Sequence, residues 1–370
     1  MEQWKEYRLG EIAEMKYGKL PNKFAEYKGQ IPIWSGYRVV GYTNSINCKK
    51  GTAIVVARGV GGTGDVKIAK EDCFLTNLSI SITLNEGICK PLYFYYKYQT
   101  KNLKYLDSGS AQSQITIEDL KRLQLNIPPI SYQNKVIELL SPFYDKIELN
   151  RKINSNLEEQ AKALFKSWFI DFEPFKGGKF VESELGKIPE GWEVCPLEQL
   201  GKFKRGKTIV AKEAKKGDIP VVAGGIDPAY YNNVANTKGP VITVSASGAN
   251  AGFMRLYYQD VWASDCSFLD SSNENLLWIY CFLNNNRKVL RHAQTGAVQP
   301  HVKPADINSI IVCIPPHELI SKFQTAVSPL FQSIGLHQKE TKRLQETRDA
   351  LLPKLMSGEI DVEQSKLLFI

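Results

Sequence analysis

Two long stretches with a heptad pattern dominate the distribution of hydrophobic and polar positions. In each, a seam residue returns at alternating steps of four and three positions, which predicts a long helix with an a/d seam. The stretches cover 136–168 and 323–355, and Pro142 and Pro329 near their starts predict a first turn or a kink. The seam positions are Val136, Leu140, Phe143, Ile147, Asn150, Asn154, Leu157 and Leu164 in the first helix, and Phe323, Val327, Leu330, Ile334, His337, Thr341, Leu344, Leu351 and Leu355 in the second.

The polar interruption of the seam occurs at the same place in both stretches. Asn150 and Asn154 align with His337 and Thr341 when the chain is shifted by 187 positions. Polar residues at such positions fix the register of a coiled coil at some cost in stability. The sustained period of 3.5 residues favours a coiled coil; the alternative is an amphipathic helix that lies on its own domain.

The remaining sequence also occurs twice. Short β-branched runs alternate with Gly, Asn and Asp turns and a few helical stretches, so each copy is predicted to be α+β. A proline pair closes each copy, because proline resists both helix and sheet. At a shift of 188, Trp4 falls on Trp192, Leu9 on Leu197, Gly18-Lys19 on Gly206-Lys207, 29–36 on 217–224, and Asp72 on Asp260; at a shift of 187, 127–130 falls on 314–317.

The duplication predicts two similar globular domains separated by two long helices, with pseudo-twofold internal symmetry. A stretch between the copies, rich in Gly, Pro and charge, is predicted to be a linker. The expected parts are a first globular domain at 1–130, a first long helix at 131–170, the linker at 171–191, a second globular domain at 192–316, a second long helix at 317–356 and a C-terminal tail at 357–370.

Composition narrows the class of protein. The 370 residues are 43% hydrophobic and 23% charged, which is typical of globular chains, and the net charge of +8 weakly favours polyanionic partners. The seven cysteines form no CxxC pair and the four histidines show no metal-ligand spacing, so buried reduced thiols and no metal site are expected. No secretory leader or membrane-spanning run is evident, and a cytoplasmic location is expected.

Candidate catalytic motifs lack their structural context. The segment 201–208 matches the P-loop pattern, but no buried strand precedes it and the first copy lacks the pattern. The glycines at 59, 61 and 64 follow a strand-like run, but no helix follows them to meet a pyrophosphate. We therefore expect a chain without catalytic residues. An ATP-dependent enzyme that uses Lys207 is the alternative from a different class.

Basic residues interleaved with aromatic and amide side chains predict a DNA-facing surface in each copy. Lys and Arg bind phosphates, and Arg, Gln, Asn and Ser can reach base edges in the major groove. The candidates are Lys16, Lys19, Tyr37, Arg38, Arg58, Ser110, Gln112 and Gln114 in the first copy, and Lys204, Arg205, Lys207, Lys212, Arg255, Arg291, His292, Gln299 and His301 in the second.

These elements, in this order and twice, resemble the specificity (S) subunit of type I restriction-modification systems. The resemblance covers essentially the whole chain. It rests on the opening with Trp and Leu, the Gly-Lys pair, the IPP closure and the long heptad helix. It also rests on a G-x2-Q loop, which begins with Gly109 and Gln112 in the first copy and with Gly296 and Gln299 in the second. The family commonly continues the proline pair as PP-x-x-x-Q; Gln133 fits this pattern in the first copy, whereas Ile320 replaces it in the second.

The resemblance implies a division of labour between subunits. Each globular domain would be a target recognition domain that reads one half of a bipartite DNA site. The two long helices would pair as an antiparallel coiled coil, which would act as a spacer and dock the modification subunits. Those subunits would bind S-adenosylmethionine and methylate adenine, and restriction subunits with a motor and a nuclease would use ATP and Mg²⁺. This chain would bind no cofactor; the alternative is a duplicated coiled-coil adaptor without sequence-specific DNA binding.

Overall fold

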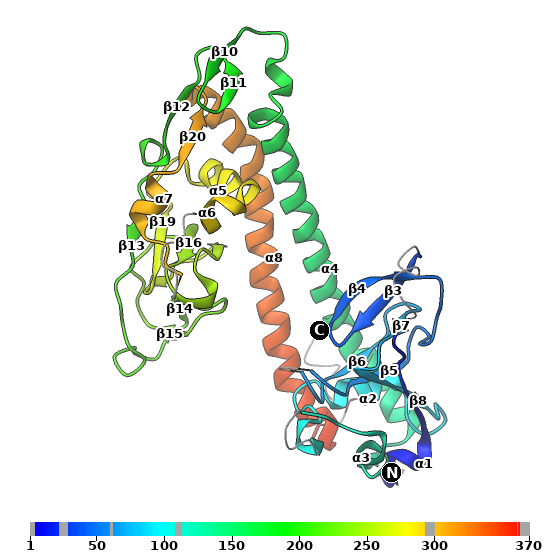
Figure 1. Cartoon of the computed structure of the whole chain (residues 1–370). Helices are drawn as coiled ribbons and strands as arrows, with labels where there is room; N and C mark the ends of the chain where they lie inside the picture. The colour runs from blue at the N-terminus through cyan, green and yellow to red at the C-terminus, as the bar shows by residue number, and fades with distance from the viewer. Residues whose placement is uncertain are drawn as a thin grey trace. The chain divides into compact units, whose positions relative to one another are not determined.

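The computed structural model describes residues 4–21, 29–59, 62–107, 113–292, 300–360 and 362, with only the backbone described at Arg291 and His292. The chain divides into two compact units (Figure 1). Unit 1 comprises Met1–Glu148 and Lys342–Ile370, and unit 2 comprises Leu149–Thr341. Each unit therefore contains one globular part and one portion of each long helix. We describe each unit by itself.

Unit 1 contains a four-stranded antiparallel sheet, a three-stranded sheet and a two-stranded pair. The four-stranded sheet has the order β2-β8-β5-β6 and the smaller sheet the order β4-β3-β7, in which β3 and β7 are parallel. The strands are β1 (Lys5–Arg8), β2 (Ala13–Tyr17), β3 (Ile31–Ser35), β4 (Arg38–Thr43), β5 (Ala53–Val56), β6 (Val66–Ile68), β7 (Phe74–Leu75), β8 (Ser79–Leu84) and β9 (Gln124–Ile127), which pairs with β1. The short helices are α1 (Leu9–Ile12), α2 (Pro91–Lys97), α3 (Ile117–Lys121) and a 3-10 turn at Lys104–Leu106.

Unit 2 repeats this topology strand for strand. Its four-stranded sheet has the order β13-β19-β16-β17, its three-stranded sheet has the order β15-β14-β18 with β14 and β18 parallel, and β12 pairs with β20. The strands are β12 (Glu193–Pro196), β13 (Lys204–Arg205), β14 (Ile219–Val222), β15 (Tyr230–Asn232), β16 (Val241–Ser245), β17 (Met254–Tyr257), β18 (Trp262–Ala263), β19 (Cys266–Asp270) and β20 (Ile311–Ile314). Helices α5 (Leu276–Asn285), α6 (Arg287–His292) and α7 (Pro304–Asn308) and 3-10 turns at Leu197–Gln199 and Gly248–Asn250 complete this part.

The repeat extends to individual backbone contacts. Gly18 and Gly206 each donate their N–H to the carbonyl at the start of the neighbouring strand, over 3.0 Å and 2.9 Å. A Cβ at either glycine would lie 2.2–2.3 Å from a backbone carbonyl oxygen, so both positions require glycine. The carboxylates of Asp72 and Asp260 each accept a backbone N–H over 2.9 Å, from Lys50 and Gly239. The predicted fold class, a duplicated α+β chain, is confirmed.

The two long helices extend beyond their heptad seams. Helix α4 covers Ile130–Phe169, 40 residues, and α8 covers His317–Ser357, 41 residues. Pro142 and Pro329 both lie about a dozen residues inside these helices, so the prediction that they mark a first turn is wrong. Tertiary packing of a long apolar face outweighs the single hydrogen bond that each proline removes.

The helices pair antiparallel within each unit. In unit 2, the rings of Phe169 and Phe323 lie 5.1 Å apart. Asn150, which precedes Phe169 along α4, donates from Nδ2 to Oγ1 of Thr341, which follows Phe323 along α8, over 3.3 Å. In unit 1, the hydroxyl of Tyr132 donates to the carbonyl of Leu355 over 2.9 Å. Since residue numbers rise along α4 while those of their α8 partners fall, the pairing is antiparallel, as predicted.

The helices also cover the core of their own unit. In unit 2, Phe165 of α4 contacts Phe323 of α8 and Trp278 of α5, with ring centroids 5.6 Å and 5.4 Å apart. In unit 1, Val136 and Leu140 of α4 and Leu352 and Leu355 of α8 belong to one buried cluster with the sheet residues. Each long helix therefore packs both on its partner helix and on the core of its unit, so the predicted pair and the alternative of a helix lying on its domain are both observed. This is possible because the apolar face is wider than an a/d stripe. The predicted seam residues are all buried or half-buried.

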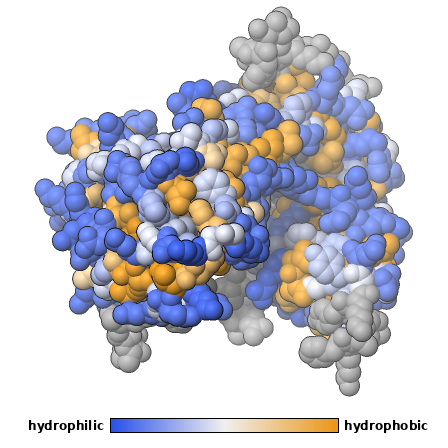
Figure 2. Space-filling view, turned by 90° about the horizontal axis from the view of Figure 1, so that it is seen from above, coloured by the Kyte–Doolittle hydropathy of each residue, from blue (hydrophilic) through white to orange (hydrophobic). Residues whose placement is uncertain are grey.

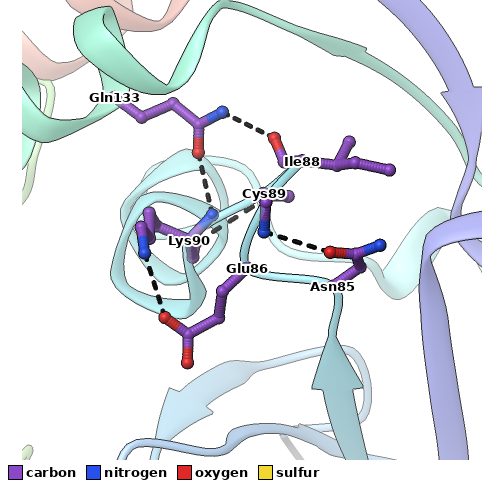
Figure 3. Close-up of polar contacts among 7 residues, drawn as sticks. Asn85, Glu86, Ile88, Cys89, Lys90 and Gln133 are labelled. Carbon is purple, nitrogen blue, oxygen red and sulfur yellow. Dashed lines mark hydrogen bonds and ion pairs between the residues drawn. The ribbon is translucent and has the colours of Figure 1, made fainter.

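Gln133 fastens the start of α4 to the segment before α2 in unit 1 (Figure 3). Its side chain is fully buried, its Nε2 donates to the carbonyl of Ile88 over 2.8 Å, and its Oε1 accepts the N–H of Lys90 over 2.8 Å. The same Nε2 donates to the carbonyl of Pro128 over 2.8 Å. One side chain thus satisfies three backbone groups that the proline pair and the turn leave without secondary-structure partners.

In unit 2, a glutamine one helical turn later fastens the long helix in a corresponding way, and we call each of these glutamine arrangements a clamp. Ile320 takes the place of Gln133 and is buried, but Gln324 donates from Nε2 to the carbonyl of Glu274 over 2.7 Å. The Oε1 of Gln324 accepts the N–H of Trp278 over 3.4 Å. The departure from the PP-x-x-x-Q pattern is therefore compensated, since residues four apart lie on the same helix face.

The predicted linker contains ordered structure in unit 2. A 3-10 turn at Glu173–Phe175 leads into a hairpin of β10 (Phe180–Ser183) and β11 (Gly186–Pro189). Ile188 and Trp192 are buried, and the rings of Phe172 and Phe175 each lie 5.3 Å from that of Trp192. Glycine, proline and charge predicted a linker, but the aromatic residues among them anchor it to the unit. Among the helices that the structure describes, none is long and apolar enough to span a bilayer.

Candidate nucleic-acid interface

Four candidate residues of unit 1 lie on exposed positions of β2 and of the β3–β4 hairpin. Lys16 is on β2, where its ammonium lies 3.7 Å from the carboxylate of Glu14, and Lys19 follows the same strand. Tyr37 and Arg38 lie at the turn between β3 and β4 and are exposed. The ammonium of Lys67 lies 4.7 Å from the centre of the Tyr37 ring, which is a cation–π geometry. Burial lowers the pKa of Lys67, against the opposing effect of Asp65.

The structure brings together Arg58 and Gln114. Arg58 follows β5 and forms an isolated antiparallel bridge with Gln114, at the end of the predicted G-x2-Q loop. Asp107 holds that end of the loop, since its carboxylate accepts the N–H of Gln114 over 2.8 Å and the hydroxyl of Ser113 over 2.5 Å. The Nε of Arg58 is buried and has no partner among the described residues. Ser110 and Gln112 lie outside the described residues.

In unit 2, the corresponding strand carries Lys204 and Arg205 as exposed residues of β13. Lys207 and Lys212 follow as exposed residues of the next segment. The backbone N–H groups of Gly206 and Lys207 donate to the carbonyls of Cys266 and Ala263, both over 2.9 Å. Since these amides are occupied and no helix follows them directly, they do not form the phosphate cradle of a P-loop.

A polar cluster connects Arg205 with His301. The guanidinium of Arg205 pairs with the carboxylate of Asp265, and the second oxygen of that carboxylate accepts the hydroxyl of Ser247 over 2.6 Å. Ser247 in turn forms an isolated antiparallel bridge with His301. This arrangement is the counterpart of the Arg58–Gln114 bridge of unit 1, because Gln114 falls on His301 in the repeat. Arg205 and His301, which lie far apart in sequence, are thus linked through Asp265 and Ser247.

Arg255, on β17, has several partners within unit 2. Its guanidinium donates to the carbonyl of Ile226 over 3.2 Å, lies 3.7 Å from the carboxylate of Asp227 and lies 4.8 Å from the centre of the Tyr257 ring. Only the backbone of Arg291 and His292 is described, at the end of α6, and Gln299 lies outside the described residues.

The acidic and hydroxyl side chains that hold the Gln114 loop end and the Arg205 guanidinium were not predicted from the sequence. Asp107 and Asp265 hold loop ends and a guanidinium, and Ser247 connects the second cluster. No pattern identified them, because their partners lie on segments that the sheets bring together from 6 to 60 positions away. Asp265 is also not repeated, since the first copy has Asn77 and Leu78 at the one-residue deletion.

Metal or thiol chemistry receives no support from the described side chains. Within those ranges, no group of three or more His, Cys, Asp or Glu residues is placed to hold a metal ion. All seven cysteines are free thiols, and five are buried. Burial raises the pKa of Cys89 to about 12, which keeps this thiol protonated and unreactive at neutral pH. On the face visible in Figure 2, hydrophilic residues alternate with smaller groups of hydrophobic residues.

Comparison with known proteins identifies the class. Residues 1–159 and 189–346 each match the family model of the type I restriction modification DNA specificity domain. The two matched segments correspond to the two copies found in the sequence and in the sheet topology. The chain belongs to this family, and it carries the DNA specificity domain twice.

Individual relatives agree with the family. The chain is 31% identical to the type I restriction enzyme MjaIX specificity subunit of Methanocaldococcus jannaschii, over 98% of this chain and 94% of that protein. It is 27% identical to the HindI specificity subunit of Haemophilus influenzae, over 67% of this chain and 71% of that protein. The crystal structure of a type I restriction-modification S subunit from M. genitalium shares the fold, with a TM-score of 0.65, 21% identity and 96% coverage of both chains.

Proposed function

We propose that this chain is the specificity subunit of a type I restriction-modification complex, in which each unit reads one half of a bipartite DNA target. The observation that carries the proposal is the strict repetition of the fold combined with different side chains at equivalent places. The glycines and aspartates that hold the backbone recur, as with Gly18 and Gly206. Some basic residues also recur, as with Lys16 and Lys204, but other polar positions differ, since Tyr17 corresponds to Arg205 and Gln114 to His301. A common backbone that carries different base-contacting side chains suits two half-sites of different sequence.

The charge distribution supports double-stranded DNA as the ligand. The net charge is +8, and the exposed Lys16 of β2 and Lys204 of β13 lie at equivalent places of the two units. Lys and Arg supply phosphate affinity, and arginine, glutamine and histidine can contact base edges. Base contacts by Arg58, Gln114, Arg205 and His301 are part of this proposal.

The helices have the length and the exposed side chains for a spacer and a docking surface. At about 1.5 Å per residue, a helix of 40 residues is about 60 Å long. Each long helix lies partly in one unit and partly in the other, so its length in residues would set the gap between the half-sites. Leu149 and Leu336 are 50% and 68% exposed on α4 and α8. We assign these two outward leucines to contacts with modification subunits.

Catalysis would belong to partner subunits. Modification subunits would bind S-adenosylmethionine and methylate adenine, and restriction subunits would use ATP and Mg²⁺ for translocation and cleavage. This chain would bind none of these cofactors and would perform neither step. The complex would act in the cytoplasm, where its DNA substrate is.

A binding experiment separates this function from that of a coiled-coil adaptor. The full chain with its modification subunits is mixed with double-stranded DNA of random sequence at rising salt concentration. We expect complexes at low salt and a steep loss of affinity as salt rises, because phosphate contacts release counterions. Selection of bound molecules should then enrich one split motif. The absence of DNA binding at low salt would support the adaptor instead.

A further inference from the structure

We propose that Arg205 reads a guanine in the half-site of unit 2 and that Asp265 positions its guanidinium for this contact. The inference rests on the proposed function, and it names the base class and the residue pair. Arginine recognises guanine through two parallel hydrogen bonds to O6 and N7, and this contact requires the guanidinium plane to be held in place. The structure provides such a support at one place in unit 2.

The backbone that carries Arg205 is fixed on both sides. Arg205 pairs with Ser267 in the ladder of β13 and β19, and the next two residues donate their N–H groups to carbonyls of Cys266 and Ala263. The indole of Trp262 also donates to the carbonyl of Lys207, over 2.7 Å. A side chain on this segment therefore starts from a rigid base, which lowers the entropy that must be lost on binding.

Asp265 holds the guanidinium by one terminal nitrogen and leaves other donors available. One oxygen of the carboxylate accepts from Nη2 of Arg205, and the other accepts the hydroxyl of Ser247. Both carboxylate oxygens are thus engaged and the carboxylate cannot rotate freely. Among the described residues, Nε and Nη1 of Arg205 have no partner, and the Arg205 side chain is 49% exposed. The guanidinium therefore presents a fixed, accessible edge with two or more donors.

Unit 1 lacks this pair, which makes the proposed reading specific to one half-site. The position of Arg205 is occupied by Tyr17, whose hydroxyl accepts the N–H of Ile117 over 3.2 Å. The position of Asp265 is occupied by Asn77 and Leu78, which carry no charge. The predicted G·C pair therefore belongs to the half-site of unit 2 and has no equivalent read by this position of unit 1.

The experiment measures base preference position by position for full-chain variants with their modification subunits. The probe is a library of double-stranded DNA with both half-sites randomised. In Arg205→Lys the charge remains but the planar fork is lost, so the preference for one G·C pair should fall by about 10-fold or more. In Asp265→Asn the same pair should lose about 5-fold. All positions of the other half-site, and the salt dependence of binding in Arg205→Lys, should be unchanged.

A matched control separates positioning from charge. Glu182→Gln on the β10–β11 hairpin removes the same charge from an exposed carboxylate paired with Lys187, and it should leave base preference unchanged. The inference is overturned if Arg205→Lys retains the full preference, which is the behaviour of a phosphate contact. It is also overturned if Asp265→Asn strengthens binding equally for every base. An unmodified chain without any sequence preference would instead contradict the proposed function itself.

Discussion

His337 and Asn154 form a hydrogen bond across the helix pair of unit 2, with Nδ1 and Oδ1 2.9 Å apart. One turn away, Asn150 is fully buried and its Nδ2 donates to the carboxylate of Glu340 over 2.8 Å. These side chains are the polar interruption that the heptad pattern placed in the seam. A polar layer of this kind disfavours other registers, because a shift of one turn would bury these groups without partners.

We predict that a double substitution is better tolerated than either single one. Asn154→Leu or His337→Leu alone leaves a half-buried polar group unpaired and should lower the free energy of unfolding by about 1 kcal/mol. Both together replace the pair by apolar contact and should restore it or raise it by about 1 kcal/mol. Denaturant unfolding of the four proteins measures the coupling. Losses that simply add would show that the two side chains do not interact.

Gln133 is predicted to be one of the least tolerant polar positions of unit 1. Gln133→Leu removes the partners of the Ile88 and Pro128 carbonyls and of the Lys90 N–H. Buried groups without partners cost about 1–3 kcal/mol each, so the free energy of unfolding should fall by about 3 kcal/mol. The control is Gln324→Leu in unit 2, where the side chain is half-buried, and a loss of about 1 kcal/mol is expected. Equal effects would contradict this account of the clamp.

The stability of unit 1 should depend on the ionisation of Asp72. Hydrogen bonds from the backbone of Lys50 and the side chain of Lys49 hold the pKa of Asp72 below its ordinary value. A lowered pKa in the folded state contributes stability above the unfolded pKa of about 3.9, and this contribution is lost as pH falls through the folded pKa.

Asp72→Asn tests that contribution, because the asparagine oxygen can still accept the backbone N–H but carries no charge. Thermal unfolding followed from pH 7 to pH 2 should show the unmodified chain more stable at pH 7. The difference should shrink below about pH 4. A difference that does not vary with pH would show that the carboxylate charge contributes nothing.

The spacer function predicts a change in the target itself. Removal of one heptad from both α4 and α8 keeps the apolar faces in phase and shortens each helix by about 10 Å. The preferred gap between half-sites should fall by about three base pairs, at about 3.4 Å each. Removal from one helix alone should instead misalign the seam and reduce stability. If site selection returns the original gap after the double deletion, the helices do not set the spacing.

The sequence predicted those features that depend on local pattern. The heptad seams that include Val136 and Phe323, together with the repeated Gly18 and Gly206, were enough to predict the duplicated fold. Both the helical period and the positions that require glycine can be recognised from the sequence alone. The pair of Arg205 and Asp265 was not predictable, because it depends on β13 lying beside β19. The hairpin at Phe180–Pro189 was missed because aromatic anchors act through tertiary contacts with Trp192.

The most direct test of a two-part DNA reader is the methylation pattern of a host genome with and without this chain. Our account predicts that deletion of the chain removes methylation from one split motif and that its reintroduction restores the same motif. A chain with Arg205→Lys should restore a motif that is relaxed in only one half. Methylation that persists without the chain, or a lost motif that is a single uninterrupted sequence, would contradict the account.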